Sequence, residues 1–384
     1  MKGKISILIL GSIATFLALG DRYVISSLYL ELMKHYSLHS TVIFSFLFSS
    51  FYLGYTITQV PGGRLAQKYG PSRVAGISMI AWSVLFILLP ITHTFSVSIA
   101  TAFILGVSQG PIFLSVIYLV RLFNRDREYA TASGIIGAAG NISPAIIPLA
   151  SLGFIYLTGN LEIPFVFFGL LGIAGGIFFV SMRTKETRND HLRNFRTFLT
   201  KRFIVFGLSF LVYDFFFYVF LTWFPYFLRA RFSIPPDDFL FSSVPWIFMS
   251  GTAVLFGILL DRINRDGMIS QVSYVLVAIS VVGMALSRNP FLFLFFVAVG
   301  LSFLNPILIS SWRLSTRLAG EENSSFVGGW MNFWGNVGGI LAPVIIASLD
   351  EIVGLTKTFL ISVIVPIIGL GTWIIMSRWK FDEE

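Results

Sequence analysis

The chain has 384 residues, of which 55% are hydrophobic and only 12% charged, and its mean hydropathy is +0.82. So few polar residues cannot cover the surface of a soluble domain of this size, which excludes a water-soluble globular protein. Cysteine is absent, which excludes disulfides, thiolate metal sites and cysteine nucleophiles. We interpret the net charge of +8 as a topology signal of membrane loops and not as a nucleic-acid-binding surface.

Apolar stretches recur along the whole chain, and each is long enough to cross about 30 Å of hydrocarbon. We therefore expect an all-α membrane protein with twelve transmembrane helices. The first stretch lacks a cleavage site followed by a soluble chain, so we expect it to stay attached as a membrane helix. The helices are expected near residues 5–31, 41–63, 73–91, 97–120, 129–158, 163–182, 203–228, 239–260, 268–286, 290–312, 325–349 and 354–377.

The basic residues are unevenly divided between the predicted loops. With the N-terminus placed inside, most of the 27 Lys and Arg residues fall in cytoplasmic segments. The positive-inside rule then predicts that both termini are cytoplasmic, in a multi-pass protein of the cell (inner) membrane.

The longest polar run, RTKETRNDHLRNFRTFLTKR, covers residues 183–202 and separates the sixth predicted helix from the seventh. It is predicted to be a basic cytoplasmic linker between an N-terminal six-helix bundle (1–182) and a C-terminal one (203–384). An amphipathic helix that binds anionic lipid headgroups is an alternative for this segment.

An internal repeat supports this division into halves. Residues 62–70 align with 256–264, and residues 133–141 align with 328–336, at nearly the same offset. Pro148 and Pro343 also correspond, and each is expected to kink its helix. Because both halves have six helices in the same orientation, the repeat is parallel, with a cavity expected between the halves.

The loops GGRLAQKYGPSRV and FGILLDRINRDG resemble the signature loop of the major facilitator superfamily. The resemblance implies two pseudo-symmetric six-helix bundles and a cytoplasmic latch made by an Asp with nearby basic residues. The second copy keeps the Asp, whereas the first has Gln67 in its place, which predicts a weakened N-terminal latch. The latch residues implied are Lys68, Arg73, Asp261 and Arg262.

Within that superfamily the chain looks most like the anion:cation symporter group, which includes sugar-acid and organic-anion transporters and is similar to vesicular glutamate and sialic-acid carriers. The likeness covers nearly the whole chain. It is found in the segments GDRYVISSL, FSSFYLGYTITQVPGGRLAQKYG, GVSQGPIFLS, FYVFLTWFPYFL and GGWMNFWGNVGGILAP.

Three charged residues lie well inside predicted membrane helices, away from the helix ends, where a charge facing lipid is costly. By resemblance, Arg22 matches the arginine that grips a substrate carboxylate, and Asp21 matches the proton-sensitive aspartate beside it. Adjacent helical residues point about 100° apart, so these two cannot face the same spot. The alternative for each is an ion pair that fixes the first helix against a neighbour. Asp214, in the seventh helix, is the third charge.

Two departures from the group's pattern affect coupling and selectivity. Gln109 stands where the group usually has a Glu, so a proton site expected there is missing, and Ala102 stands where some relatives have an Arg. Asp214 is a candidate to carry the coupling proton instead of position 109. Pairing with Arg22 or with a backbone group is the alternative for Asp214.

Uncharged residues complete the expected binding site. Tyr55 matches a substrate-contacting tyrosine of the group, and Gln109 lies in the same predicted cavity. Core hydrogen bonding is the alternative for Tyr55 and for the two repeat-related asparagines, and aromatic packing against lipid is the alternative for the other residues among the remaining candidates. These are Asn141 and its repeat mate Asn336, with Trp330, Asn332 and Trp334 beside the latter.

These observations predict a secondary active transporter that works by alternating access and carries a small organic anion, a carboxylate or sugar acid, in symport with protons. Transport of a neutral, zwitterionic or cationic solute such as an amino acid is the alternative, motivated by Asp214 and by the missing charges in the fourth helix. No catalytic or nucleotide-binding pattern favours an enzyme. We expect no cofactor and no metal, a monomer in the lipid bilayer, and a small molecule and protons as its ligands.

Overall fold

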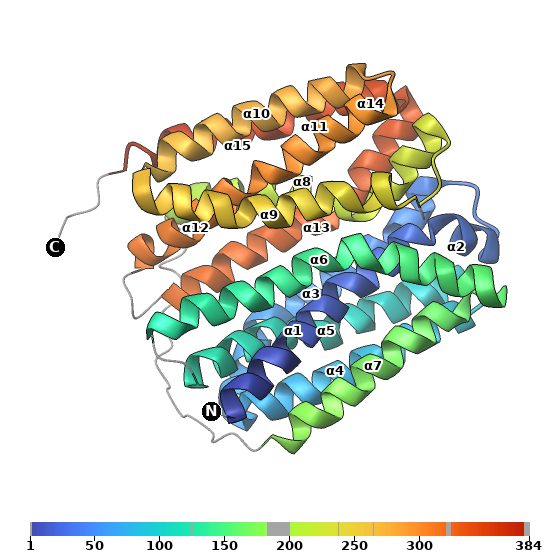
Figure 1. The fold of residues 1–384 in the computed structure, drawn as a ribbon, viewed down its shortest axis with the longest axis horizontal. Coiled ribbons are helices and arrows are strands. Elements are labelled where there is room, and N and C mark those ends of the chain that lie inside the picture. The colour runs from blue at the N-terminus through green and yellow to red at the C-terminus, as the bar shows by residue number, and fades with distance from the viewer. Residues whose placement is uncertain are drawn as a thin grey trace. The chain divides into compact units, whose positions relative to one another are not determined.

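A computed structural model describes residues 2–123, 126–182, 200–236, 238–263, 265–319 and 324–379. In these residues the only regular secondary structure is helical (Figure 1). The first half contains α1 (Lys2–Ser27), α2 (Tyr29–His35), α3 (Thr41–Tyr69), α4 (Pro71–Leu88), η1 (Leu89–Ile91), α5 (Phe95–Phe123), α6 (Asp126–Thr158) and α7 (Glu162–Ser181). The second half contains α8 (Lys201–Phe232), α9 (Phe239–Ile263), α10 (Asp266–Leu286), α11 (Pro290–Ser302), α12 (Leu304–Ala319), α13 (Ser324–Val353), α14 (Leu355–Ser362) and α15 (Ile364–Met376).

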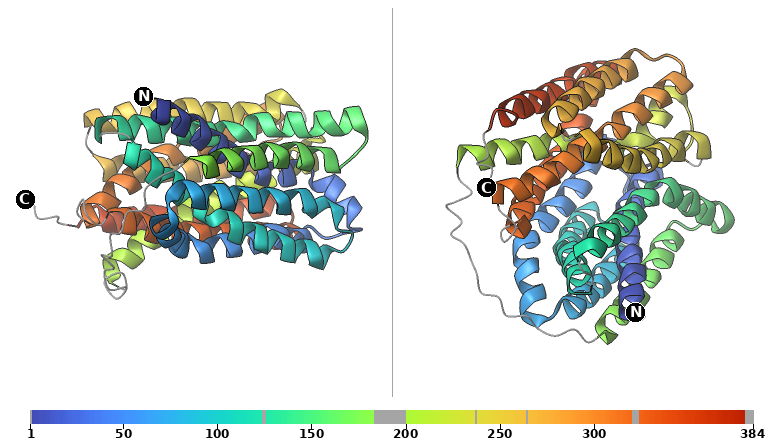
Figure 2. Two further views of the ribbon diagram at one scale, coloured as in Figure 1. Left: turned by 90° about the horizontal axis from the view of Figure 1, so that it is seen from below. Right: turned by 60° about the vertical axis from the view of Figure 1, so that its left-hand side comes forward.

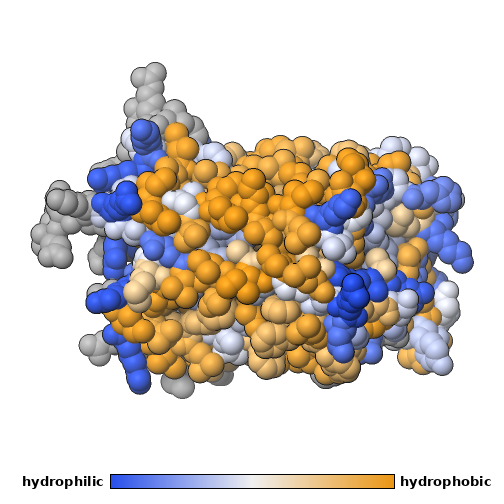
Figure 3. Space-filling view, turned by 90° about the horizontal axis from the view of Figure 1, so that it is seen from above, coloured by the Kyte–Doolittle hydropathy of each residue, from blue (hydrophilic) through white to orange (hydrophobic). Residues whose placement is uncertain are grey.

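Twelve helical spans in the described residues are long and apolar enough to cross a membrane, which confirms the expected number. On the face seen in Figure 3, hydrophobic side chains cover the middle of the helices and hydrophilic ones gather toward the helix ends. This pattern is typical of helices whose middle portions lie in hydrocarbon.

Besides the first expected helix, which is interrupted at Leu28 between α1 and α2, two more spans that were expected as single helices are each interrupted at one residue. The tenth span is divided at Phe303 into α11 and α12, and the twelfth at Val363 into α14 and α15. Both interruptions lie three residues before a proline, Pro306 and Pro366 respectively. A proline has no N–H to donate to the carbonyl four residues earlier, so the helical ladder is broken just before it.

Short turns connect several spans. Gly70 has a φ of 85°, which a residue with a side chain rarely adopts, and it lets α3 turn sharply into α4 with Pro71 at the first position. Ser40 caps α3, because its hydroxyl accepts a bond from the Ile43 N–H at 3.2 Å. Asn289 caps α11 in the same way, accepting from the Phe291 N–H at 2.8 Å.

The chain divides into two compact units. Unit 1 contains residues 1–191 with 235–239, and unit 2 contains residues 192–234 with 240–384. Of the predicted linker, residues 183–199 lie outside the described residues, so its role and its limits stay a prediction.

Within each unit the helices run side by side (Figure 2). In unit 1 the most extensive packing joins α3 with α5, α4 with α7, and α1 with α6. In unit 2 the most extensive packing joins α8 with α13, and the packing of α10 on α11 and on α15 is less extensive. The pairs α1–α6 and α8–α13 are equivalent in the repeat, so the duplicated sequence forms the same pair of packed helices twice. Pro148 and Pro343 lie inside the continuous helices α6 and α13.

Candidate functional site: a buried arginine in unit 1 and a carboxylate in unit 2

Arg22 lies near the C-terminal end of α1, and only 6% of its surface is exposed. Its Nη2 donates a hydrogen bond of 2.9 Å to Oε1 of Gln109 on α5. A guanidinium is always ionised in proteins, so a positive charge is held inside the helical bundle by a neutral amide. The structure thus brings together two residues that the sequence analysis assigned to one site.

Three aromatic rings of α3 lie against the same guanidinium. Its Cζ atom is 4.8 Å from the ring centroid of Phe51, 5.3 Å from that of Tyr52 and 4.9 Å from that of Tyr55. These distances are within the range of cation–π attraction, which is strengthened where water is excluded. Tyr55 therefore lies beside Arg22 as expected, and Phe51 and Tyr52 are members of the site that the sequence analysis missed.

Close packing of α3 on α5 positions the rings and the amide. A Cβ on Gly54 would overlap the Phe103 carbonyl oxygen, and a Cβ on Gly106 would overlap the carbonyl oxygen of Phe51. Only glycine permits this backbone approach, which is the way in which small residues act at membrane helix interfaces. The two glycines thus bring Phe51 of α3 and Gln109 of α5 toward one side chain of α1.

Gln109 has one hydrogen-bonding group to spare. The residue is 1% exposed, and its Nε2 has no hydrogen-bond partner among the described residues. A buried amide N–H without an acceptor is costly, so such groups are common where a ligand binds. Arg22 and Gln109 together can offer N–H donors to an anion.

Asp21 faces a different helix from Arg22. It is 3% exposed, and its Oδ2 accepts a hydrogen bond from the indole Nε1 of Trp82 on α4. The expectation that the two adjacent charges face different places is therefore confirmed. Trp82 was not identified from the sequence, where nothing distinguishes it from an apolar core residue.

Unit 2 has a carboxylate where α8 packs on α13. Asp214 is half-buried, and a Cβ on Gly335 would overlap its Oδ2. One turn further along α8, the hydroxyl of Tyr218 donates a bond of 3.4 Å to Oδ1 of Asn336, which is 3% exposed. Asp214, Tyr218 and Asn336 form a polar cluster between two helices that are otherwise lined by aromatic and small residues.

The other uncharged candidates make mostly structural contacts. The indole of Trp330 donates to the Phe203 carbonyl at 3.0 Å, and the Asn332 carbonyl accepts a 2.7 Å bond from the Asn336 amide. Asn141 and Trp334 are half-buried. A role for these residues in substrate binding stays a prediction.

The predicted latch residues lie at helix ends. Lys68, Arg73 and Arg262 are exposed, and the Nζ of Lys68 is 5.1 Å from the ring centroid of Tyr69. The side chain of Asp261 lies outside the described residues. A latch function for these four residues stays a prediction.

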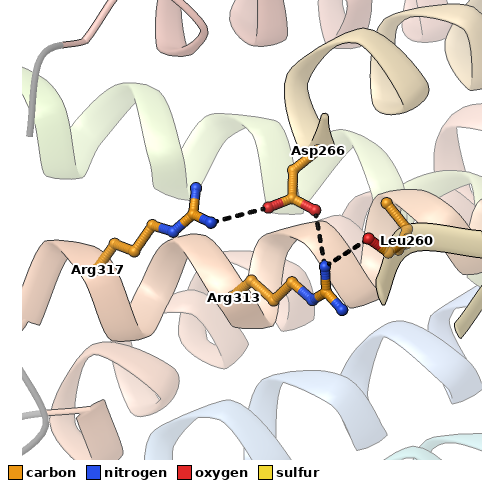
Figure 4. A network of polar contacts seen from close by, with 4 residues as sticks. All are labelled: Leu260, Asp266, Arg313 and Arg317. Atoms are coloured by element: carbon orange, nitrogen blue, oxygen red, sulfur yellow. Dashed lines mark hydrogen bonds and ion pairs between the residues drawn. The ribbon is translucent and has the colours of Figure 1, made fainter. Parts of the chain in front are cut away.

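An ion-pair network that the sequence analysis did not identify joins α9, α10 and α12 (Figure 4). Asp266, at the start of α10, lies 3.3 Å from Nη1 of Arg313 and 3.5 Å from Nη2 of Arg317. The same Nη1 of Arg313 donates to the Leu260 carbonyl at 3.2 Å, at the C-terminal end of α9. The spacing of the two arginines, one helical turn apart, is the only signal of this network in the sequence.

No group of three or more His, Cys, Asp or Glu residues that could hold a metal ion occurs among the described residues. In unit 1 the candidate groups are hydrogen-bond donors, aromatic rings and the Asp21 carboxylate. In unit 2 they are the Asp214 carboxylate and its polar neighbours Tyr218 and Asn336.

Comparisons with known proteins agree with this architecture. The family model described as Major Facilitator Superfamily matches residues 11–343. The hexuronate transporter of Bacillus subtilis (strain 168) is 22% identical, over 82% of this chain and 79% of its own length. The probable galactarate/D-glucarate transporter GarP of Escherichia coli (strain K12) is 26% identical, over 89% of this chain and 87% of its own.

A solved structure shares the fold. A bacterial homolog of the human lysosomal transporter Spinster, in an inward-facing and unoccupied conformation, has a TM-score of 0.81 at 13% identity. The alignment covers 98% of this chain and 97% of that one. The twelve-helix fold expected from the signature loops is therefore confirmed, as is the likeness to sugar-acid transporters.

Proposed function

Because the chain belongs to the major facilitator superfamily, we propose that it is a secondary active transporter that carries a small organic anion, a carboxylate or sugar acid, in symport with protons. Alternating access between two states would move the anion across the membrane. The relatives that transport hexuronate and galactarate or D-glucarate support a sugar acid as the substrate.

The buried guanidinium of Arg22 is the observation that carries this proposal. It is 6% exposed within an apolar helix and is hydrogen-bonded to a neutral amide. A charge inside a membrane protein is expensive and is retained where it binds a ligand or a partner. Its planar donors match a carboxylate in a bidentate arrangement, and the spare amide N–H of Gln109 adds one more donor.

Proton coupling is assigned to the carboxylates in the membrane helices. Asp21 and Asp214 are the candidates, because Gln109 cannot titrate and the three histidines within the described residues, His35, His39 and His93, lie in loops or at helix ends. A carboxylate whose proton affinity differs between the two states can couple proton movement to transport.

The same proposal includes topology and assembly. Both termini are cytoplasmic, the protein lies in the cell membrane, and it acts as a monomer. The excess of basic residues in the segments assigned to the cytoplasm supports the orientation. Reporter fusions at each terminus that are active only on the outer side would contradict it.

Transport of an amino acid or another zwitterionic or cationic solute is the second candidate function. Asp214 favours it, since a half-buried carboxylate on α8 can bind an ammonium group. Ala102 also supports this second candidate, because a buried alanine provides no basic group for an anion at the position where some relatives have an Arg.

Ligand binding to the purified protein tests the two candidates. D-Glucarate and D-glucuronate are compared with amino acids and neutral sugars by thermal shift, because a ligand that binds only the folded state raises its apparent stability. We expect stabilisation by the sugar acids. Stabilisation by amino acids alone would favour the second candidate.

Substitutions of Arg22 test its role directly. Arg22→Ala should weaken sugar-acid binding by at least about thirtyfold, since losing one member of a buried charge pair costs about 2–5 kcal/mol. Arg22→Lys should keep part of the affinity, because an ammonium lacks the bidentate geometry. Arg378→Ala, which removes an exposed arginine at the end of the last helix, is the matched control. Near-normal binding by Arg22→Ala would reject the proposal.

A further inference from the structure

We propose that Trp82 is a positioning residue for the anion site: by holding the Asp21 carboxylate toward α4, it prevents that carboxylate from neutralising Arg22. This inference rests on the proposed function, in which Arg22 binds the substrate anion. It assigns a role to a residue that does not contact the substrate.

Asp21 and Arg22 are neighbours in the chain but bond to different helices. The carboxylate accepts from Trp82 on α4, whereas the guanidinium donates to Gln109 on α5 and lies against the rings of α3. The two charged side chains and their hydrogen-bond partners are almost completely buried: Trp82 and Gln109 are each 1% exposed, Asp21 3% and Arg22 6%. The separation of the two charges is therefore built into the packed interior of unit 1.

A carboxylate placed next to an arginine in a medium of low polarity is the arginine's strongest competitor for a substrate carboxylate. Charge attraction is several times stronger in the interior than in water, so an anion must displace any internal ion pair before it can bind. A hydrogen bond from an indole N–H satisfies the carboxylate without introducing a positive charge. Trp82 thus gives Asp21 a hydrogen-bond partner on α4, a different helix from α5, to which the Arg22 donor is bonded.

Loss of the indole N–H should change which group Asp21 bonds. A buried carboxylate without a donor is costly, and Arg22 is the charged side chain next to it in the chain. In a Trp82→Phe protein we expect the released carboxylate to change its rotamer and move closer to Arg22, although the two side chains leave α1 about 100° apart. The Asp21 carboxylate would then neutralise the guanidinium, and substrate anions would bind more weakly.

A purely structural role of Trp82 makes a different prediction. If the hydrogen bond only ties α1 to α4, its loss should loosen the helices whether or not residue 21 carries a charge. The two accounts differ in a background where Asp21 is replaced by Asn, since a neutral amide does not compete for Arg22.

Four proteins form the test: the parent, Trp82→Phe, Asp21→Asn and the double variant. Their dissociation constants for D-glucarate and D-glucuronate are measured by calorimetry at one pH. We expect Trp82→Phe to weaken binding at least tenfold in the parent and less than twofold in the Asp21→Asn background. Equal weakening in both backgrounds, or unchanged binding by Trp82→Phe, would overturn the inference.

Controls separate folding from positioning. Trp373→Phe removes another buried indole, whose N–H has no hydrogen-bond partner among the described residues, and should leave binding unchanged. If Trp82→Phe fails to fold, 3-benzothienylalanine at position 82 keeps the shape of the indole and removes only the N–H. If Arg22→Ala still binds the sugar acids, or if the parent does not bind them, the proposed function is rejected. If binding is lost in Arg22→Ala but is unchanged in Trp82→Phe, only the positioning role of Trp82 is rejected.

Discussion

The repeat places a glycine at the same position in the two halves, and the two glycines face different neighbours. Gly140 of α6 lies against α1, where a Cβ would be 3.5 Å from the Thr15 carbonyl oxygen and 3.8 Å from Leu19 Cδ1. Gly335 of α13, 195 residues later, lies against α8, where a Cβ would overlap the Asp214 carboxylate.

The same offset carries Leu19 onto Asp214, so the two positions correspond in packing but not in chemistry. Asp21 and Arg22 correspond in turn to Phe216 and Phe217. Duplication has therefore preserved the contact between equivalent helices, whereas the charges have been placed at different positions of the two copies. The N-terminal half holds a carboxylate and a cation side by side in α1, whereas the C-terminal half holds the Asp214 carboxylate in α8, and each of these charges is supported by the packing around it.

The largest difference between the halves is expected from Gly335→Ala and Gly140→Ala. The methyl group at position 335 must displace the Asp214 carboxylate, so we expect a loss of about 1–3 kcal/mol in the free energy of unfolding together with loss of transport. At position 140 the methyl group makes ordinary contacts, and both quantities should change little. Unfolding and uptake are measured for both proteins under identical conditions, and equal effects would contradict the comparison.

The next largest effect is expected from Asp214→Asn, which separates proton coupling from the conformational change that moves the substrate. A permanently neutral side chain permits the conformational change but carries no proton, so exchange between two substrate-loaded compartments should persist while pH-driven accumulation stops. Liposomes with an imposed pH gradient measure both activities.

Asp21→Asn is the comparison for that experiment. If accumulation survives in Asp214→Asn and is lost in Asp21→Asn, the proton belongs to α1. If it survives in both, neither carboxylate couples transport to protons.

A smaller effect is expected from Asn336 and Asn141, which occupy equivalent positions in the two halves of the repeat. Asn336→Ala removes the bond from Tyr218 and the bond to the Asn332 carbonyl, which should cost about 1 kcal/mol of unfolding free energy. Asn141→Ala should cost less than about 0.5 kcal/mol, because Asn141 is half-buried and makes no side-chain hydrogen bond within the described residues. Denaturant unfolding of both variants checks this order, and a reversed order would show that α6 depends more on its asparagine than α13 does.

Small effects on stability, comparable with those at the two asparagines, are expected in the network at Asp266, which belongs to unit 2. Asp266→Asn should cost about 1 kcal/mol, because it weakens two ion pairs at once. Arg313→Gln should cost more than Arg317→Gln, since the Arg313 side chain is 28% exposed and also bonds the Leu260 carbonyl, whereas that of Arg317 is 50% exposed. An Arg317→Gln protein that loses more stability than Arg313→Gln would contradict this account.

The sequence by itself determined the number of spans, because each apolar run must cover the hydrocarbon thickness and its backbone can satisfy its hydrogen bonds only as a helix. It also determined that Gly140 and Gly335 are equivalent, through the repeat. The angle between consecutive helical residues was enough to predict that Asp21 and Arg22 face different places.

Only the tertiary structure decided which groups those charges meet. Gln109 lies 87 residues from Arg22, and Trp82 lies 61 residues from Asp21. Periodicity and composition report which face of a helix is buried, but the identity of the side chain across the interface depends on how helices distant in the chain pack together. For the same reason, the contact of Asp214 with a glycine and the bonds of Asp266 to Arg313 and Arg317 could be found only in the folded chain.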